Sequence, residues 1–203
     1  HSTSRRQRQM CIRDRLNRLT EQGFLSSHHW CKIEHPASRL LENYLEGSVQ
    51  SLTLQVTQQC NLKCEYCPYS GGFYNRQHNN RKMSFEIAKK AIDFYFLHSF
   101  DIPDAQIGFY GGEPLIEFEM IRRIVEYCNN EYYGKKIRYF VTTNATLLTE
   151  EKIDFLMKNN FVLTISLDGP RQYHNKNRHR VDDTGSFDIV MELSLIHISE
   201  PTR

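Results

Sequence analysis

The strongest constraint on the fold is a regular alternation of strand-like and helix-like segments along the chain. Short runs rich in apolar residues predict strands at about residues 51–57, 105–110, 137–142 and 162–167. Each run is followed by a segment in which apolar residues recur every three to four positions. Strands that alternate with helices pair in parallel through right-handed crossovers. The sequence therefore predicts an α/β fold in which four parallel strands lie adjacent in chain order with helices on the outer face.

The predicted helices begin and end at recognisable residues. Ser84 is placed to cap the first helix through its side-chain oxygen. The apolar residues expected on the core face of that helix are Ile87, Ala91, Phe94 and Tyr95. Further helices are expected at about residues 117–130 and 149–159. A last helix is expected to begin in the segment 185–193, after a long polar loop.

Sequence on either side of this pattern predicts the domain organisation. Residues 16–48 hold short helical patterns, the second closed by Gly47 as a C-cap, and indicate the end of a small upstream module or a linker. Residues 1–15 and 193–203 resemble translations of the adapters used in sequencing libraries, so we expect both ends to pack poorly. Residues 49–192 are then expected to form the N-terminal half of an α/β barrel.

Composition argues against two classes of partner. The 203 residues include 26 basic and 24 acidic side chains, and the net charge of +2 offers no electrostatic basis for binding nucleic acid or an anionic membrane. The longest strand-like apolar stretch, 161–167, is far shorter than the roughly 20 residues of a bilayer span. We therefore expect neither a nucleic-acid nor a membrane partner.

Three of the cysteines lie in the stretch CNLKCEYCPYS, which begins at Cys60 just after the first predicted strand. The chain has six cysteines, and an odd number remains once Cys11 in the adapter-like end is set aside. An odd, clustered set favours reduced thiols and a cytoplasmic location over a secreted disulfide framework. Cys128 follows apolar residues at helical spacing and is expected in the core, whereas Cys31 carries no prediction.

Cys60, Cys64 and Cys67 allow more than one kind of metal site. A structural zinc site would need a fourth ligand from a distant group such as His78 or Cys128. Three thiolates can instead bind three irons of a four-iron four-sulfur cluster, which leaves one iron open to a small molecule. Unliganded cysteines in a surface loop would expose reactive thiols without purpose. The three-thiolate cluster therefore fits the spacing best.

The spacing Cys60-x-x-x-Cys64-x-x-Cys67, with the aromatic Tyr66 before the third cysteine, resembles the signature of radical S-adenosylmethionine (SAM) enzymes. The resemblance implies a partial radical SAM barrel, a 4Fe-4S cluster on the three cysteines, and S-adenosylmethionine on the fourth iron, with Tyr66 among the cofactor-binding residues. It further implies that one electron cleaves the sulfonium and that a 5′-deoxyadenosyl radical abstracts hydrogen from the substrate.

Further motifs are similar to those of the same family, and each lies at the carboxyl end of a predicted strand. The segment GGEP resembles the family's glycine-rich segment, which implies cofactor contacts from Gly111, Gly112, Glu113 and Pro114. In this resemblance the carboxylate of Glu113 accepts hydrogen bonds from the cofactor's ammonium group. The segment TTNA departs from the family's usual glycine after asparagine, and it implies a contact between Asn144 and the ribose.

The segment ISLDGPRQYHNKNR resembles the fourth-strand segment of the peptide- and protein-modifying branch. By this resemblance Ser166 and Arg178 bind the cofactor carboxylate, for which an arginine fork is well suited. Asp168 is expected to shape the turn or to serve as a polar contact. Tyr69 is expected close to the substrate, with a packing role as the alternative.

Within the family the motifs look most like SPASM-type peptide maturases, with anaerobic sulfatase-maturating enzymes as the alternative. Both imply a peptide or protein substrate, an electron donor of the reductase or flavodoxin/ferredoxin type, and auxiliary clusters in a C-terminal extension. The upstream module would then be the end of a leader-peptide recognition domain. A non-catalytic zinc or iron–sulfur binding module is the alternative from another class.

Overall fold

The computed structural model describes residues 2–24, 34–68 and 79–198, and the chain divides into two compact units, 1–39 and 40–203. The first unit contains helix α1 (Ser2–Glu21), in which Ile12 and Leu16 are exposed. Helix α1 covers most of the first adapter-like segment as well as the first predicted helical pattern. Across the described residues, no helix is long and apolar enough to cross a bilayer.

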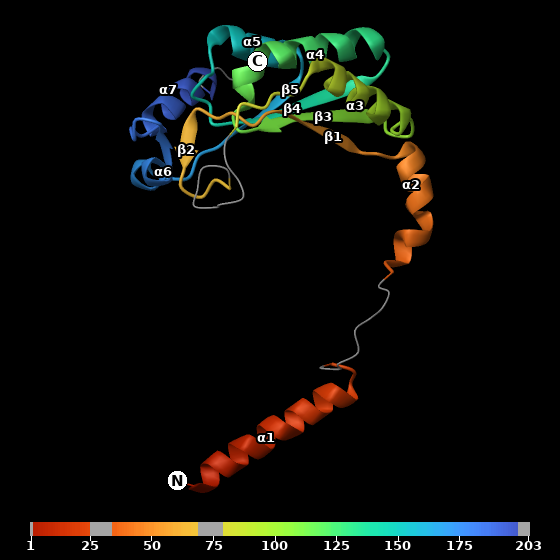
Figure 1. Cartoon of the computed structure of the whole chain (residues 1–203), viewed down its shortest axis with the longest axis vertical. Helices are drawn as coiled ribbons and strands as arrows, with labels where there is room; N and C mark the ends of the chain where they lie inside the picture. Colours follow the sequence, from red (N-terminus) through yellow and green to blue (C-terminus); the bar gives the residue numbers. More distant parts are fainter. Residues whose placement is uncertain (1, 25–33, 69–78, 199–203) are drawn as a thin grey trace. The chain divides into compact units, whose positions relative to one another are not determined.

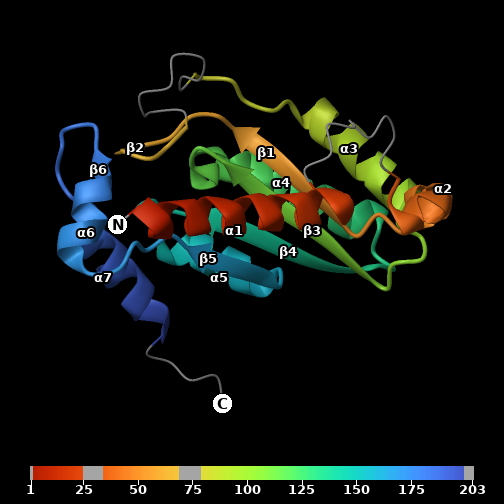
Figure 2. The same cartoon turned by 90° about the horizontal axis from the view of Figure 1, so that it is seen from below.

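The second unit is built on a four-stranded parallel sheet in the order β1-β3-β4-β5. Its strands are β1 (Ser51–Thr57), β3 (Asp104–Gly111), β4 (Lys136–Thr143) and β5 (Phe161–Ile165). Figures 1 and 2 show the four strands side by side. The predicted fold class, strand order and direction are therefore confirmed, although β5 ends at Ile165, two residues before the predicted position.

Three helices cover one face of this sheet: α3 (Phe85–Leu97), α4 (Phe118–Glu131) and α5 (Glu150–Lys158) (Figure 1). A row of side chains crosses the strands beneath them, because Ile107 pairs with Tyr139 and Tyr139 pairs with Phe161. The Tyr139 and Phe161 rings stack with their centroids 5.1 Å apart. This apolar layer makes the sheet a rigid base for the loops at its carboxyl edge.

Helix α3 starts where the sequence predicts and buries Tyr95 as expected, but two of its other predicted core residues are exposed. The Ser84 hydroxyl accepts a hydrogen bond from the backbone N–H of Ile87, which confirms the N-cap. Ile87 and Phe94 were expected in the core and are instead 58% and 59% exposed. The buried residues are Ala88, Ile92, Tyr95 and Phe96. Both sets repeat at the helical period, so only packing on the sheet selects between two adjacent apolar stripes.

Gly47 ends α2 (Leu41–Gly47), but its role differs from the predicted C-cap. Its backbone lies outside the left-handed region that a glycine cap adopts. A Cβ at this position would lie 2.5 Å from the Phe100 ring. Close packing of helix backbone against an aromatic ring therefore explains this glycine.

A second, two-stranded sheet lies in a region that the sequence predicts to be loop. Strand β2 (Leu62–Cys64) pairs antiparallel with β6 (Arg178–Arg180), directly after helix α6 (Arg171–Asn177). The expected long polar loop is therefore wrong. Three-residue strands lack a detectable period, and they form here because each supplies backbone partners to the other.

Helix α7 (Phe187–Ile198) forms the predicted last helix and packs beside α6 (Figure 2). It continues into the second adapter-like segment, where Leu193 is half-buried against the core. The remaining side chains of that segment, from residue 195 onward, lie outside the described part of the chain. The adapter origin of residues 1–15 and 193–203 stays a prediction.

Candidate functional site

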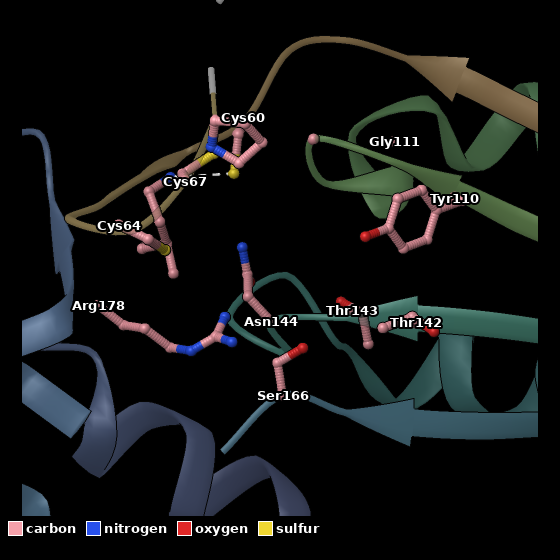
Figure 3. A pocket seen from close by; sticks show the side chains of 13 residues that line it. Cys60, Cys64, Cys67, Tyr110, Gly111, Thr142, Thr143, Asn144, Ser166 and Arg178 are labelled. Atoms are coloured by element: carbon pink, nitrogen blue, oxygen red, sulfur yellow. Dashed lines mark hydrogen bonds between the residues drawn. The ribbon is translucent and has the colours of Figure 1, made fainter. Parts of the chain in front are cut away.

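A pocket opens at the carboxyl edge of the four-stranded sheet, where parallel α/β folds gather functional groups (Figure 3). Its walls come from the loop after β1, the ends of β3 and β4, the residue after β5, and strand β6. The lining residues are Cys60, Leu62, Cys64, Cys67, Pro68, Tyr110, Gly111, Gly112, Thr142, Thr143, Asn144, Ser166 and Arg178. Segments far apart in the sequence thus meet in one cavity.

The three predicted ligand cysteines, Cys60, Cys64 and Cys67, all line this pocket and are half-buried reduced thiols. Backbone hydrogen bonds hold their loop in shape. The N–H of Leu62 donates to the sulfur of Cys60 at 3.5 Å, and the N–H of Cys67 donates to the carbonyl of Cys64 at 3.0 Å. Cys64 also lies in β2, directly opposite Arg178 in β6. The loop is therefore preorganised by both local and long-range contacts.

The environment of the thiols bears on what they can bind. Burial raises the pKa of the Cys60 thiol, and burial raises that of Cys64 to about 11 although the nearby Arg178 charge opposes the shift. Metal binding would therefore release protons from both thiols. Among the described residues, no three His, Cys, Asp or Glu side chains lie close enough to surround one ion. Thiols spread around one cavity suit a group with several metal atoms, each taking one thiolate.

Other groups named for the metal site lie elsewhere. Cys128 is fully buried in the hydrophobic core on α4, which confirms its predicted packing role. His78 and the predicted substrate-proximal Tyr69 lie outside the described residues, as does Cys31.

The two glycines of the GGEP segment are needed for a close approach between strands. Gly111 has a φ of +150°, and a Cβ there would lie 2.2 Å from the carbonyl oxygen of Thr57. A Cβ on Gly112 would lie 2.3 Å from the carbonyl oxygen of Gln59. The Gly112 N–H donates to the Thr57 carbonyl at 3.1 Å. The glycines therefore let the end of β3 lie in close contact with the end of β1 and the start of the cysteine loop.

Glu113 lies behind the pocket wall and is fully buried. Its Oε1 accepts hydrogen bonds from the N–H of Leu115 at 3.0 Å and the hydroxyl of Thr143 at 2.7 Å. Its Oε2 accepts from the N–H of Asn144 at 2.8 Å. Burial raises the pKa of this carboxyl group, and the three donors oppose the shift. Glu113 thus joins the ends of β3 and β4, and Pro114 beside it is also buried outside the pocket lining.

Asn144 lines the pocket, and its side chain connects β4 to the cysteine loop. Its Nδ2 donates to Oδ1 of Asn61 at 2.9 Å, and Asn61 Nδ2 donates to the Thr146 hydroxyl at 2.8 Å. The Asn144 Oδ1 accepts from the Thr146 N–H at 3.0 Å. Sequence reasoning missed Asn61, whose only signal is its place between two ligand cysteines.

Arg178 forms a compact group with Asp168 and Tyr66. The Nε of Arg178 lies 2.9 Å from Oδ1 of Asp168, an ion pair that is not aligned as a hydrogen bond. The hydroxyl of Tyr66 donates to Oδ2 of Asp168 at 2.8 Å, and the guanidinium carbon lies 5.4 Å from the centre of the Tyr66 ring. Gly169 has a φ of +88°, so it provides the left-handed residue of the turn. Asp168 therefore does more than shape this turn.

The structure brings most predicted cofactor residues to one cavity and adds several that the sequence did not indicate. Ser166 lies on the wall that faces the three cysteines, and Arg178 extends into the pocket from beside Cys64 (Figure 3). Tyr66 is about half exposed beside Arg178, outside the lining. The additional lining residues are Leu62, Pro68, Tyr110, Thr142 and Thr143. They have no chemical signature in the sequence, because their role comes from strand ends meeting at one edge.

Comparison with known proteins agrees with this geometry. Residues 54–194 match the Radical SAM superfamily. A serine-type anaerobic sulfatase-maturating enzyme of Bacteroides thetaiotaomicron is 33% identical over 136 residues, which cover 66% of this chain and 32% of the relative. The radical SAM cyclopropyl synthase TigE of Paramaledivibacter caminithermalis is 28% identical over 200 residues, covering 92% of this chain and 41% of the relative.

Solved structures give the same result. Native anSMEcpe with bound AdoMet superposes with a TM-score of 0.60 and 29% identity, covering 72% of this chain and 40% of that one. Native anSMEcpe with bound AdoMet and the Cp18Cys peptide superposes with a TM-score of 0.58. The chain thus spans about two fifths or less of the length of these relatives. With the cysteine spacing, the sheet and the match over 54–194 in agreement, the chain belongs to the radical SAM superfamily.

Proposed function

We propose that this chain is the cofactor-binding part of a radical SAM enzyme that modifies a side chain of a peptide or protein. The observation that carries this proposal is the single pocket shared by three thiols, Ser166 and Arg178. One-electron reductive cleavage and hydrogen-atom abstraction are the chemistry that a 4Fe-4S cluster with S-adenosylmethionine supplies when bound.

Each pocket residue has a role in this proposal. Cys60, Cys64 and Cys67 hold one iron each as thiolates. Arg178 and Ser166 bind the cofactor carboxylate, because a planar guanidinium offers paired donors to an anion in a partly dehydrated pocket. Ser166 lies across the cavity from the cysteines, and Arg178 extends into the cavity from its place beside Cys64, so both residues border the space next to the thiols (Figure 3).

The other residues predicted to contact the cofactor are assigned roles that agree with the contacts they make in the structure. Gly111 and Gly112 offer backbone to the cofactor, and Asn144 contacts its ribose. Glu113 accepts hydrogen bonds from three donors of the chain, two at Oε1 and one at Oε2, so we assign it mainly to holding Asn144. The remaining acceptor position on Oε2 is assigned to the ammonium contact. Pro114 and Tyr66 support the pocket from outside its lining, and Tyr69, which lies outside the described residues, stays a predicted substrate contact.

The substrate class rests on the relatives. They include sulfatase-maturating enzymes, TigE and the mycofactocin maturase MftC, and anSMEcpe has been solved with bound peptides. We assign this protein to the SPASM-type peptide maturases, with anaerobic sulfatase maturation as the alternative. A cytoplasmic location and an electron donor of the reductase or flavodoxin/ferredoxin type complete the proposal.

Anaerobic reconstitution with iron and sulfide tests this function. This chain should bind about four irons, measured by elemental analysis, and the full-length protein should form 5′-deoxyadenosine from S-adenosylmethionine with a strong reductant, measured by chromatography. Cys64→Ala should abolish the product, whereas Cys128→Ala, a change in the core, should retain it. Zinc without iron in the protein as purified and reconstituted would support the non-catalytic module instead. Product formed at the normal rate by Cys64→Ala would overturn the assignment.

A further inference from the structure

We propose that Asp168 is a positioning residue that orients the guanidinium of Arg178 toward the pocket. This inference rests on the proposed function, in which Arg178 binds the carboxylate of S-adenosylmethionine. It adds a residue whose sequence context indicates only a turn.

The two oxygens of the Asp168 carboxylate have separate partners. Oδ1 lies 2.9 Å from Nε of Arg178, and Oδ2 accepts the Tyr66 hydroxyl at 2.8 Å. The Tyr66 ring also lies beside the guanidinium, 5.4 Å from its central carbon. Carboxylate and ring together restrict the arginine on its Nε side and along one face.

This arrangement leaves the paired end of the arginine directed into the cavity. Figure 3 shows the terminal nitrogens of Arg178 turned toward Asn144 and Ser166. Because the ion pair uses Nε, the two terminal amino groups can meet a carboxylate as a fork. An arginine without this restraint would lose rotamer entropy on binding, which weakens affinity.

The main chain at both ends of the ion pair is held by one series of buried and partly buried hydrogen bonds. The N–H of Asp168 donates to Nδ1 of His174 at 3.3 Å. The hydroxyl of Ser186 donates to the carbonyl of Arg178 at 2.9 Å, and Nε2 of His174 lies 2.9 Å from that hydroxyl. With Nδ1 accepting, Nε2 carries the proton and donates to Ser186. His174 therefore fixes the backbone of Asp168 relative to that of Arg178.

A competing interpretation of Asp168 predicts an effect of opposite sign. Its carboxylate could neutralise Arg178 and compete with the incoming carboxylate of the ligand. The side chains of Arg178 and Asp168 are only 15% and 23% exposed, so their interaction is weakly screened in either case. Removing the charge would strengthen binding if Asp168 competes, and it would weaken binding if Asp168 positions Arg178.

Binding of S-adenosylmethionine to the cluster-loaded protein separates the two interpretations. Calorimetry under anaerobic conditions should show affinity weakened about tenfold or more by Asp168→Asn, through loss of charge-assisted contacts. Asp168→Glu should recover part of the loss because it restores the charge. Asp183→Asn is the matched control, because its side chain is 86% exposed and the charge change is the same. Unchanged or tighter binding by Asp168→Asn at equal iron content would overturn the proposal.

A second measurement needs no cofactor. In the apoprotein, NMR relaxation of the Arg178 Nε should show a side chain of restricted mobility, which becomes more mobile in Asp168→Asn and stays restricted in Asp183→Asn. Equal mobility of Arg178 in Asp168→Asn and the unchanged protein would overturn the positioning role. If the unchanged protein loads its cluster but binds no S-adenosylmethionine, the proposed function fails, while this mobility measurement still decides whether Asp168 orients Arg178.

Discussion

At the scale of single residues, the site depends on groups that face away from the cavity as much as on those that line it. Glu113 and Gly111 belong to a motif that the family resemblance links to the cofactor. In the structure both residues make contacts within the chain. These contacts shape the pocket before any molecule binds. Substitution of either residue should therefore lower the stability of the protein even without the cofactor.

Glu113→Gln should destabilise the apoprotein by about 1–3 kcal/mol, because a buried amide N–H₂ would face at least one backbone or hydroxyl donor. Urea denaturation of the apoprotein checks this. Glu119→Gln is the control, since that side chain is 79% exposed. An unchanged unfolding midpoint in Glu113→Gln would show that the three hydrogen bonds contribute nothing net.

Gly111→Ala should cost about 1–3 kcal/mol or more of unfolding free energy, because it adds backbone strain to a clash with the carbonyl of Thr57. Gly134→Ala is a matched control, since a Cβ there meets nothing within 4 Å. Thermal unfolding of both variants gives the comparison. Equal midpoints would contradict the close approach of the end of β3 to the end of β1.

At the scale of elements, contacts between helices, strands and loops fix the positions of the segments that form the pocket. Tyr95 on α3 is one example. Its hydroxyl donates to the carbonyl of Gln50 at 3.1 Å and accepts from the N–H of Gln106 at 2.9 Å. One buried hydroxyl thus links α3 by hydrogen bonds to the beginnings of β1 and β3.

Tyr95→Phe should lower the free energy of unfolding by about 1–3 kcal/mol, because it leaves a carbonyl and an N–H without this partner. Tyr133→Phe, at a position that is 88% exposed, should leave it unchanged. Chemical denaturation distinguishes the two. A loss of equal size in both variants would count against the bridging role.

Helix α6 contributes a pH dependence through His174. Burial and the charge of Arg178 lower the pKa of His174, while Asp168 opposes the shift, and Ser186 and the Phe187 ring complete its surroundings. The folded state therefore takes up a proton less readily than the unfolded chain. This contribution to stability is complete above the unfolded pKa of about 6.5 and declines as the pH falls below it.

The urea midpoint of the apoprotein should accordingly fall between pH 7.5 and pH 5.5 by more than in His174→Gln, which removes the titrating group. The His174→Gln variant keeps every other titrating group, so its pH dependence is the baseline for the comparison. A pH dependence of the same size in both proteins would contradict a neutral, buried His174.

At the scale of the whole molecule, the pocket joins segments that are distant in sequence, so a ligand that bridges them should stabilise the fold. Loading with iron and sulfide should raise the unfolding midpoint, since binding to the folded state alone adds stability by mass action. Cys60→Ala should lose this rise and Cys128→Ala should keep it. Anaerobic thermal unfolding provides the test, and a full rise in Cys60→Ala would exclude the three-cysteine site.

The sequence by itself determined the four parallel strands, their order, the cap at Ser84 and the loop that carries the three cysteines. These features depend on apolar periods and on spacings within a few residues. The local geometry of strands and helices sets those periods, so they can be recognised in the sequence. The radical SAM family follows from the same local motifs.

Only the tertiary structure decided the buried face of α3, the pairing of β2 with β6 and the partners of Asp168. Two apolar stripes on α3 satisfy the same helical period, and contact with the sheet selects one of them. Tyr66 and Asp168 are 102 positions apart, and neither carries a local signal of the other. Such contacts arise because parallel strands bring their carboxyl ends to one edge, where hydrogen-bonding groups find partners in space rather than along the chain.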